Sequence, residues 1–222
     1  MENEKETVIY SGVDIERHGV LVVSDVNFKV FGSELVTLDG HIGSGKSSLF
    51  KTLYGDLPIR KGSAKVLGFE LNGISDRKIS QLRRRMGIVF QEYQLFDNKT
   101  VSGNLEFVID SLGFKTPCPK DEYINGILEK VGIPGKASSF THMLSGGERQ
   151  SVAIARAIVC NPEILIADEP TGNLDDASAK HIAGLLYSLS LEGKSVIVAT
   201  HDGGVFRDFP HRELHIEGGK LF

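Results

Sequence analysis

The sequence predicts an α/β protein with a mainly parallel core sheet, an antiparallel β subdomain and a helical insert. Apolar runs at residues 164–167 and 195–200 alternate with segments of helical periodicity, which is typical of parallel strands covered by helices on both faces. Short β-prone runs lie between residues 7 and 31, whereas residues 92–143 show helical periodicity. A chain of 222 residues that is 41% hydrophobic is long enough to bury such a core.

The N-terminal part is expected to supply the antiparallel sheet. Its β-prone runs at residues 7–10, 21–23 and 26–30 are broken by Gly12 and Gly19. The next expected elements are a buried strand from Leu35, a helix from about Lys46 to Tyr54 that Gly55 ends, a strand over residues 63–68, a helix with Ile79, Leu82 and Met86 on one face, and a strand over residues 87–90.

The remaining elements divide the chain into a core and an insert. Leu105, Val108, Ile109 and Leu112 form one helical stripe, and Ile124, Ile127, Leu128 and Val131 form another. After them we expect a helix from Ser145 to about Asn161, a strand over residues 164–167, a helix ending near Leu189 and a strand over residues 195–200. We therefore predict a single domain over residues 1–222, in which residues 7–91 and 144–222 form the α/β core with the antiparallel β subdomain and residues 92–143 form a helical subdomain.

The composition narrows the classes of partner. A net charge of −4 gives no reason to expect nucleic acid. Cys118 and Cys160 lack the spacing of a metal site, and no signal-peptide pattern precedes the acidic start. No apolar run is long enough to span a bilayer. The cysteine usage therefore favours the cytoplasm, and any attachment to a membrane would come through a partner.

A glycine-rich stretch is predicted to bind the phosphates of a nucleotide. The pattern G-x-x-x-x-G-K-S runs from Gly40 to Ser47, and its glycines let backbone N–H groups approach an anion at the start of a helix. Lys46 is expected to reach the β- and γ-phosphates, and the Ser47 hydroxyl to ligate Mg²⁺. The alternative is a structural turn with an exposed lysine. The predicted binding residues are Gly40, His41, Ile42, Gly43, Ser44, Gly45, Lys46, Ser47 and Ser48.

Two adjacent carboxylates, Asp168 and Glu169, follow the apolar strand at residues 164–167. Ligands of open α/β sheets bind at the carboxyl ends of the strands, so both side chains are expected beside the phosphate-binding loop. Asp168 is predicted to hold Mg²⁺ opposite Ser47, and Glu169 to take a proton from the attacking water. A solvated Asp-Glu turn is the alternative, and pairing with the phosphate-binding loop disfavours it.

A second candidate phosphate site lies at Ser145, Gly146, Gly147 and Glu148. Ser145 can cap the helix that follows, and the two glycines leave N–H groups accessible to an anion. With Glu148 at the third helical position, the same residues also fit a purely structural capping box.

The order of these motifs resembles the ABC ATPase family over essentially the whole chain. The motifs are the phosphate-binding loop, Gln91, Leu-Ser-Gly-Gly-Glu at residues 144–148, Asp168-Glu169, Asn-Leu-Asp at residues 173–175, and His201. The resemblance implies a P-loop NTPase fold and ATP hydrolysis with Mg²⁺. It further implies that Gln91 touches Mg²⁺ and the attacking water, that Asp175 communicates between two ATP sites, and that His201 contacts the γ-phosphate.

The same resemblance implies a head-to-tail homodimer on ATP binding. Ser145, Gly146, Gly147 and Glu148 of one chain would then close over the ATP that the phosphate-binding loop of the other chain holds. A purely structural nucleotide-binding module would not need Glu169 and His201 together.

Two positions depart from the family pattern. The family stacks an aromatic ring on the adenine from a position shortly before residues 21–23, where this chain has Glu16, Arg17 and His18. Arg17 and His18 are the candidates for stacking on the base, since Tyr10 lies too early in the chain. Ser151 replaces an arginine that is usual in the family, and we have no physical account of its consequence.

Residues 167–175 resemble the FtsE/LolD/MacB subgroup of the family, and residues 49–54 and 82–91 look most like its cell-division members. That resemblance implies an integral membrane partner like FtsX, which would hold this cytoplasmic chain peripherally on the inner face of the cell membrane. It also implies a groove beside Gln91 and the helical insert, at Tyr93 and Phe96, that receives a short helix of this partner. The alternatives are the ATPase of a lipoprotein-release or export transporter and, less favoured, a soluble ABC protein that acts on nucleic acid.

Overall fold

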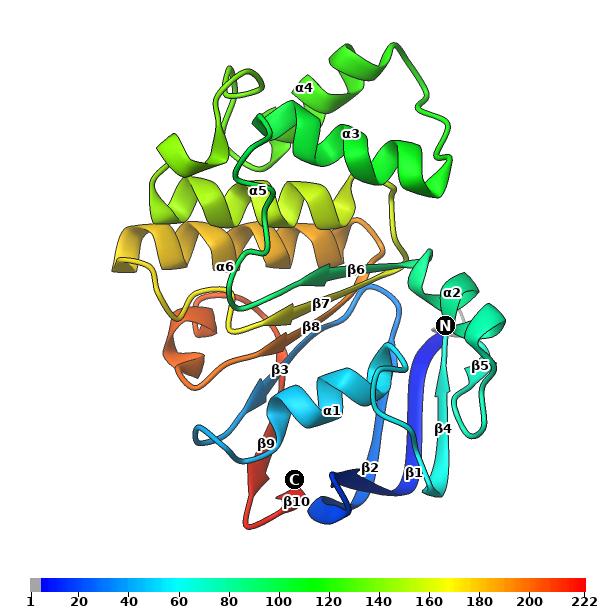
Figure 1. Ribbon diagram of the computed structural model, residues 1–222. Coiled ribbons are helices and arrows are strands. Elements are labelled where there is room, and N and C mark those ends of the chain that lie inside the picture. Colours follow the sequence, from blue (N-terminus) through cyan, green and yellow to red (C-terminus); the bar gives the residue numbers. More distant parts are fainter. Residues whose placement is uncertain (1–4) are drawn as a thin grey trace.

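The computed structural model describes residues 5–222, which fold into two sheets and the helices around them (Figure 1). The strands are β1 (Glu6–Arg17), β2 (Val20–Phe31), β3 (Leu35–Asp39), β4 (Lys61–Val66), β5 (Phe69–Glu70), β6 (Met86–Val89), β7 (Ile164–Asp168), β8 (Ser195–Ala199), β9 (Arg212–Glu217) and β10 (Lys220–Leu221). The helices are α1 (Lys46–Leu53), α2 (Asp76–Arg83), α3 (Val101–Leu112), α4 (Lys120–Lys130), α5 (Gly146–Ile158) and α6 (Asp176–Leu191), with short 3-10 helices η1 (Thr141–Met143) and η2 (Gly203–Phe206).

The larger sheet has the strand order β10-β9-β3-β8-β7-β6, and all its neighbours from β9 to β6 run parallel. Every residue of β8 is buried, and so are the first four of β3 and β7, because helices or the second sheet cover both faces. The carboxyl ends of β3, β7 and β8 therefore meet at one edge, where the predicted site residues follow each strand.

The smaller sheet is antiparallel, in the order β2-β1-β4-β5. The sequence predicted short strands broken at Gly12, whereas β1 continues through this residue to Arg17. Gly12 has φ +60°, and the pairing of β1 with β2 shifts between Tyr10 and Val13, so the glycine forms a bulge inside the strand. Gly19, with φ +77°, lies in the turn that joins β1 to β2.

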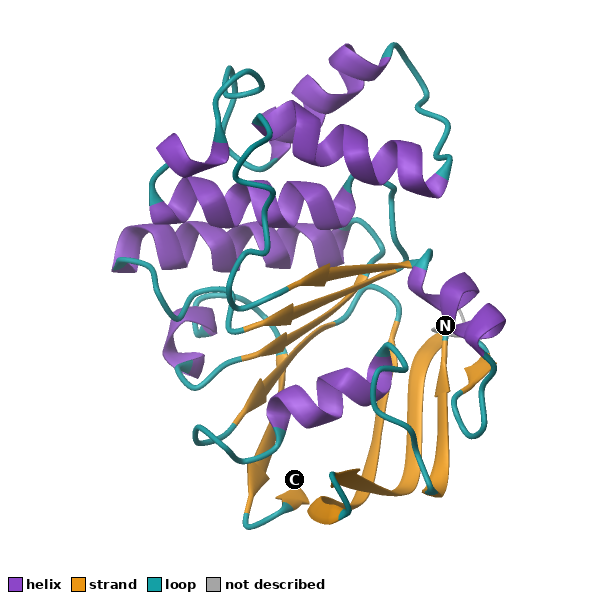
Figure 2. Cartoon of the chain, in the orientation of Figure 1, coloured by secondary structure: helices purple, strands orange, loops and turns teal. Residues whose placement is uncertain are grey.

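Helices lie on both faces of the parallel sheet, in two separate layers (Figure 2). α1 lies between the two sheets, in a core that includes Phe50 and Leu53. α5 and α6 cover the opposite face, and α3 and α4 lie beyond α5, in a second core that includes Leu105 and Leu128. Within residues 5–222, no helix combines the length and apolarity needed to cross a membrane.

Two expectations for secondary structure were wrong. Met86 opens β6 instead of continuing the helical face of Ile79 and Leu82, because α2 ends at Arg83. The expected elements also lack β5, β9 and β10. β9 has only Leu214 and Ile216 as buried residues, between charged and polar neighbours, so it lacks the continuous apolar run of β7 and β8. The division into a core and a helical subdomain over residues 92–143 remains our proposal.

Candidate functional site

The phosphate-binding loop joins β3 to α1, and two of its glycines are required by their surroundings. Gly45 has φ +114°, and a Cβ atom there would lie 2.5 Å from a methyl group of Val23. A Cβ atom on Gly40 would lie 2.7 Å from the carbonyl oxygen of Ile216 on β9. The loop is therefore packed tightly from behind by β2 and β9, and a side chain at either position would force it outward.

The start of α1 has no side-chain cap. Its N-cap residue is Gly45, no side chain there accepts a hydrogen bond from the helix, and the first turn contains no acidic residue. The N–H groups of the first turn and the positive end of the helix dipole are thus available to an anion.

Lys46 is almost fully buried beneath this loop. Its Nζ atom donates to the Gly40 carbonyl oxygen at 2.6 Å and lies 3.4 Å from Oε1 of Glu169. One ammonium group therefore connects the loop with the carboxylate that follows β7.

Asp168 ends β7 and hydrogen-bonds to the side chain of Ser47. Its Oδ1 atom is buried and has no hydrogen-bond partner within residues 5–222. Burial raises the pKa of the Asp168 carboxyl, and the Glu169 charge adds to this, while the hydrogen bond from Ser47 opposes it. An unpaired carboxylate oxygen beside a serine hydroxyl is a donor set that suits a hard cation such as Mg²⁺.

Glu169 and His201 form a pair across the ends of β7 and β8. Nδ1 of His201 lies 2.7 Å from Oε2 of Glu169, and the His201 backbone N–H donates to the same oxygen at 3.3 Å. An ionised carboxylate can only accept, so Nδ1 of His201 is the donor in this contact. A Cβ atom on Gly172 would touch both side chains, at 3.4 Å from His201 and 3.6 Å from Glu169.

A cavity of about 380 Å³ brings most of the predicted residues together. Gln91 enters it from the loop after β6. The residues that line it are Arg17, Val22, Ile42, Gly43, Ser44, Gly45, Lys46, Ser47, Ser48, Gln91, Glu169 and His201. Gly40 and His41 instead line a neighbouring cavity, together with Ile42, His201 and His215.

The structure distinguishes between the residues considered for stacking on the adenine ring. Arg17, at the end of β1, lines the cavity, and so does Val22 of β2, which the sequence analysis missed. His18 is in the turn after β1 and does not line it. Tyr10 is buried, stacks on Phe28 and hydrogen-bonds to Thr52. No local pattern marks Val22, because it reaches the cavity only when the β1–β2 hairpin packs against the phosphate-binding loop.

Ser145, Gly146, Gly147 and Glu148 do not line this cavity. They begin α5 and form a complete capping box: Ser145 Oγ accepts from the Glu148 N–H, and the Glu148 carboxylate accepts from the Ser145 N–H at 2.9 Å. Asp175 lies outside the cavity as well and caps α6 by accepting from the N–H and hydroxyl of Ser178. The capping box that the sequence allowed is therefore present.

Comparisons with known proteins agree with this geometry. A family model described as ABC transporter matches residues 23–172, more than half of the chain. The chain belongs to the ABC transporter family. The cell division ATP-binding protein FtsE of Streptococcus pneumoniae serotype 2 is 39% identical over 204 residues, which cover 92% of this chain and 88% of the relative. The glutamine transport ATP-binding protein GlnQ of Bacillus subtilis is 35% identical over 202 residues, 90% of this chain and 82% of GlnQ.

A solved structure supports the enzymatic assignment of this ABC ATPase. The dimeric post-hydrolysis structure of the ATP-binding cassette MJ0796, bound to ADP and Pi, matches with a TM-score of 0.84 and 29% identity, and the match covers 96% of each chain. The predicted fold class and the predicted resemblance to the FtsE group are confirmed. The chain is an ABC-type ATPase, which binds ATP and hydrolyses it to ADP and phosphate.

Proposed function

We propose that this ABC ATPase is the ATP-hydrolysing subunit of a membrane complex that acts in cell division, with an FtsX-like integral membrane protein as its partner. The observation that carries the catalytic part is the single cavity shared by the phosphate-binding loop, Gln91, Glu169 and His201. The similarity to FtsE over 92% of the chain supports the cell-division part.

In this proposal, the loop and Lys46 hold the phosphates of ATP. Glu169 accepts a proton from water as the water oxygen attacks the γ-phosphorus, and the bond to the β-γ bridging oxygen breaks to release ADP. His201 donates to Glu169 through Nδ1 and thereby orients the carboxylate, and its ring, which lines the cavity, is proposed to contact the γ-phosphate. Gln91, which lines the same cavity, positions the water.

Mg²⁺ fits the residues at the end of β7. Ser47, Asp168 and Gln91 offer a hydroxyl, a carboxylate and an amide oxygen, and the Oδ1 atom of Asp168 is buried without a partner in the described part of the chain. When bound with ATP, Mg²⁺ would neutralise charge on the β- and γ-phosphate oxygens. We propose these three residues as its ligands.

The base of ATP is proposed to lie against the β1–β2 hairpin. Arg17 can stack its planar guanidinium on the adenine, and Val22 supplies an apolar contact. Both contacts would tolerate other nucleobases, because neither side chain forms a fixed set of hydrogen bonds to the edge of one base.

A head-to-tail homodimer is proposed for the ATP-bound enzyme. In one chain, the capping box of Ser145, Gly146, Gly147 and Glu148 lies away from the cavity, so these residues can reach a γ-phosphate only from a second copy. Asp175 caps the start of α6. In the dimer it would carry the signal between the two ATP sites. The dimeric state of MJ0796 supports this arrangement.

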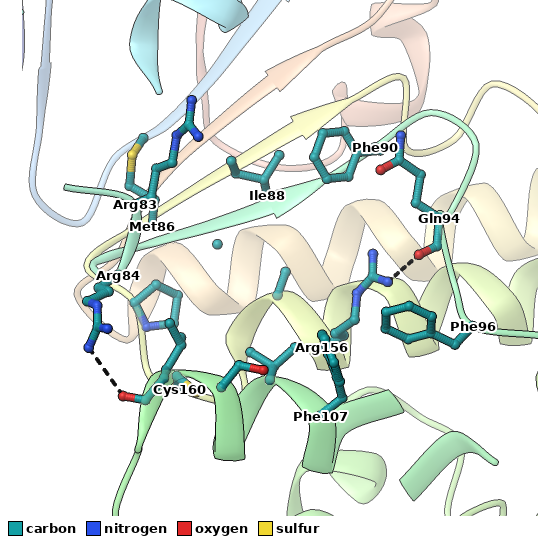
Figure 3. A pocket seen from close by; sticks show the side chains of 16 residues that line it. Arg83, Arg84, Met86, Ile88, Phe90, Gln94, Phe96, Phe107, Arg156 and Cys160 are labelled. Atoms are coloured by element: carbon teal, nitrogen blue, oxygen red, sulfur yellow. Dashed lines mark hydrogen bonds between the residues drawn. The ribbon is translucent and has the colours of Figure 1, made fainter. Parts of the chain in front are cut away.

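The docking site for the partner is proposed to be a cavity of about 420 Å³ between β6 and α3 (Figure 3). Its walls are largely apolar and include Ile88, Phe90 and Phe107. Arg83 and Arg84 lie at one end, and Gln94 and Phe96 at the other. This arrangement suits a short amphipathic helix with an acidic residue facing the arginines.

The structure refines the predicted docking surface. Phe96 lines the cavity and is 37% exposed, whereas Tyr93 does not line it and packs against the core around α5. Arg83 donates to the carbonyl oxygen of Tyr54 at 2.9 Å, so its guanidinium is fixed at the rim. This placement of Arg83 supports a contact with the partner.

The alternative is the ATPase subunit of a transporter of the LolD or MacB type. The identity of 35% with GlnQ, a glutamine transport ATP-binding protein, supports this alternative. Both functions use the same catalytic cavity, so the membrane partner distinguishes them. A soluble nucleic-acid clamp has less support, since the net charge of the chain is −4.

Copurification from detergent-solubilised membranes tests the proposal. We expect the tagged chain to retain an FtsX-like membrane protein and the Phe96→Asp variant to lose it. Leu191→Asp is the matched control, because Leu191 is 67% exposed on α6, away from the cavity. A transporter permease in the eluate would establish the alternative, and partner retention by a folded Phe96→Asp variant would contradict the docking site.

A further inference from the structure

Arg156 of α5 contacts a segment at the end of the docking cavity where Gln94 and Phe96 lie. Its guanidinium donates to the carbonyl oxygen of Tyr93 at 2.9 Å and to that of Gln94. Figure 3 shows the side chain of Arg156 directed to Gln94, with Phe96 and Phe107 beside it. Arg156 therefore joins the helix that begins with Gly146 to the segment at residues 92–97, which follows Gln91.

The backbone that Arg156 holds is strained. Tyr93 and Gln94 have φ values of +48° and +51°, in the left-handed region that side chains other than glycine rarely adopt. Two consecutive residues of this kind persist only where their surroundings fix them. The two hydrogen bonds from one charged, planar group supply such a constraint.

Arg149 holds the same segment two helical turns earlier on α5. Its Cζ atom lies 5.1 Å from the centre of the Tyr93 ring, and a terminal nitrogen lies 3.4 Å from Oδ1 of Asp97. A Cβ atom on Gly146 would lie 3.5 Å from the Tyr93 hydroxyl. One face of α5, from its first residue to Arg156, thus follows residues 92–97.

The other end of the segment is fixed to α3. Asn104 is fully buried, accepts from the Phe96 N–H at 2.8 Å and donates to the Phe96 carbonyl oxygen at 3.1 Å. The segment is therefore held between two helices. Arg156 contacts both of its strained residues and also lines the docking cavity.

We propose that Arg156 is a positioning residue for ATP hydrolysis, which fixes residues 92–97 to α5 so that Gln91 and Ser145 move as one unit. It acts through these residues and does not itself line the catalytic cavity. The inference rests on the roles proposed above for Gln91 and Ser145. It makes Arg156 the link between the docking cavity and both phosphate-facing motifs.

Steady-state kinetics of the full chain test this inference. Arg156→Met keeps an apolar stem and removes the donors, so we expect kcat to fall by about tenfold or more while KM for ATP stays within about twofold. Amide hydrogen exchange should accelerate together at residues 92–97 and 145–150. Arg212→Met is the matched control. Arg212 lies on β9, outside the catalytic cavity, and pairs with Glu34 at 2.6 Å. The kcat of this variant and its hydrogen exchange in both segments should match those of wild type.

Three outcomes separate the possibilities. A kcat for Arg156→Met within twofold of wild type, or faster exchange at residues 92–97 alone, overturns the inference. If Arg156→Met fails to fold, the same measurements on Arg156→Lys decide, with an expected loss of about threefold because an ammonium can still donate to a carbonyl. Full activity of Gln91→Ala and Ser145→Ala would instead overturn the proposed roles of those two residues.

Discussion

The starts of α1 and α5 are both glycine-containing helix ends that the sequence predicts to face phosphate, yet they are built differently. α1 begins after Gly45 with no side-chain cap and no acidic residue in its first turn. α5 begins after Ser145 with a complete capping box, and Lys136 forms an ion pair with Glu148 at 2.8 Å. One start therefore leaves its N–H groups to a ligand, and the other satisfies those of Ser145 and Glu148 from its own chain.

The difference fits the division of labour that we propose. An uncapped helix start is stable enough here because β2 and β9 pack behind the loop, and it can bind ATP in the single chain. The capped start keeps its shape until a second chain brings a phosphate to it. The Ser145 Oγ accepts from Glu148 at 3.3 Å, a long contact that a phosphate oxygen can replace.

Removing the charge at the open start is expected to have the largest effect. Lys46→Ala should weaken ATP binding by at least about 100-fold, because charge-assisted contacts contribute roughly 1.5–3 kcal/mol each and two phosphates lose theirs. Turnover should fall with it. Isothermal titration calorimetry and a steady-state assay give both values, with Lys65→Ala, on the exposed pair with Glu70, as the control. ATP affinity equal to that of wild type would show that the open start is not the phosphate site.

The next largest effect should come from Glu169→Gln. This variant tests whether the start of α1 in one chain meets the start of α5 in a second chain when ATP is bound. The amide keeps the shape of the carboxylate but loses the base, so we expect kcat to fall by about 10²–10⁴-fold while ATP still binds. The ATP-bound dimer should then accumulate, as light scattering after size-exclusion chromatography can measure. Asp168→Asn should fail differently, by weakening binding of Mg-ATP. Hydrolysis at the wild-type rate by Glu169→Gln would rule out its role as base.

The sequence was sufficient where a single element carries the signal. β3, β7 and β8 are continuous apolar runs because both faces are buried, and the glycine pattern at residues 40–47 records a local backbone requirement. Sequence alone was insufficient where two elements must first meet. Val22 enters the cavity only through the packing of the β1–β2 hairpin, and Arg156 reaches residues 93 and 94 only through the placement of α5.

The two helix starts also show what a motif leaves open. Ser145 and Glu148 fit both a capping box and a phosphate site, and the structure contains the capping box without excluding the other role. No periodicity decides between them, because the second role requires a second chain. Separate measurements on the starts of α1 and α5 can therefore decide what the sequence motif at residues 145–148 leaves open.

The smallest predicted effect is a difference in how amide hydrogen exchange at the starts of α1 and α5 responds to pH. Hydrogen bonds from Lys136 and from the Ser145 N–H hold the pKa of the Glu148 carboxyl below its usual value, so its contribution to stability is present above about pH 4.3 and is lost as the pH falls through the folded-state pKa. Amide exchange, corrected for its intrinsic pH dependence, should rise by about two- to fivefold in the first turn of α5 on acidification, consistent with roughly 0.5–1 kcal/mol for a carboxylate at a helix start. The first turn of α1 has no carboxylate of its own, so its response should be smaller and should not depend on Glu148. Glu148→Gln should abolish the response of α5, and an equal response at both starts would contradict the distinction between them.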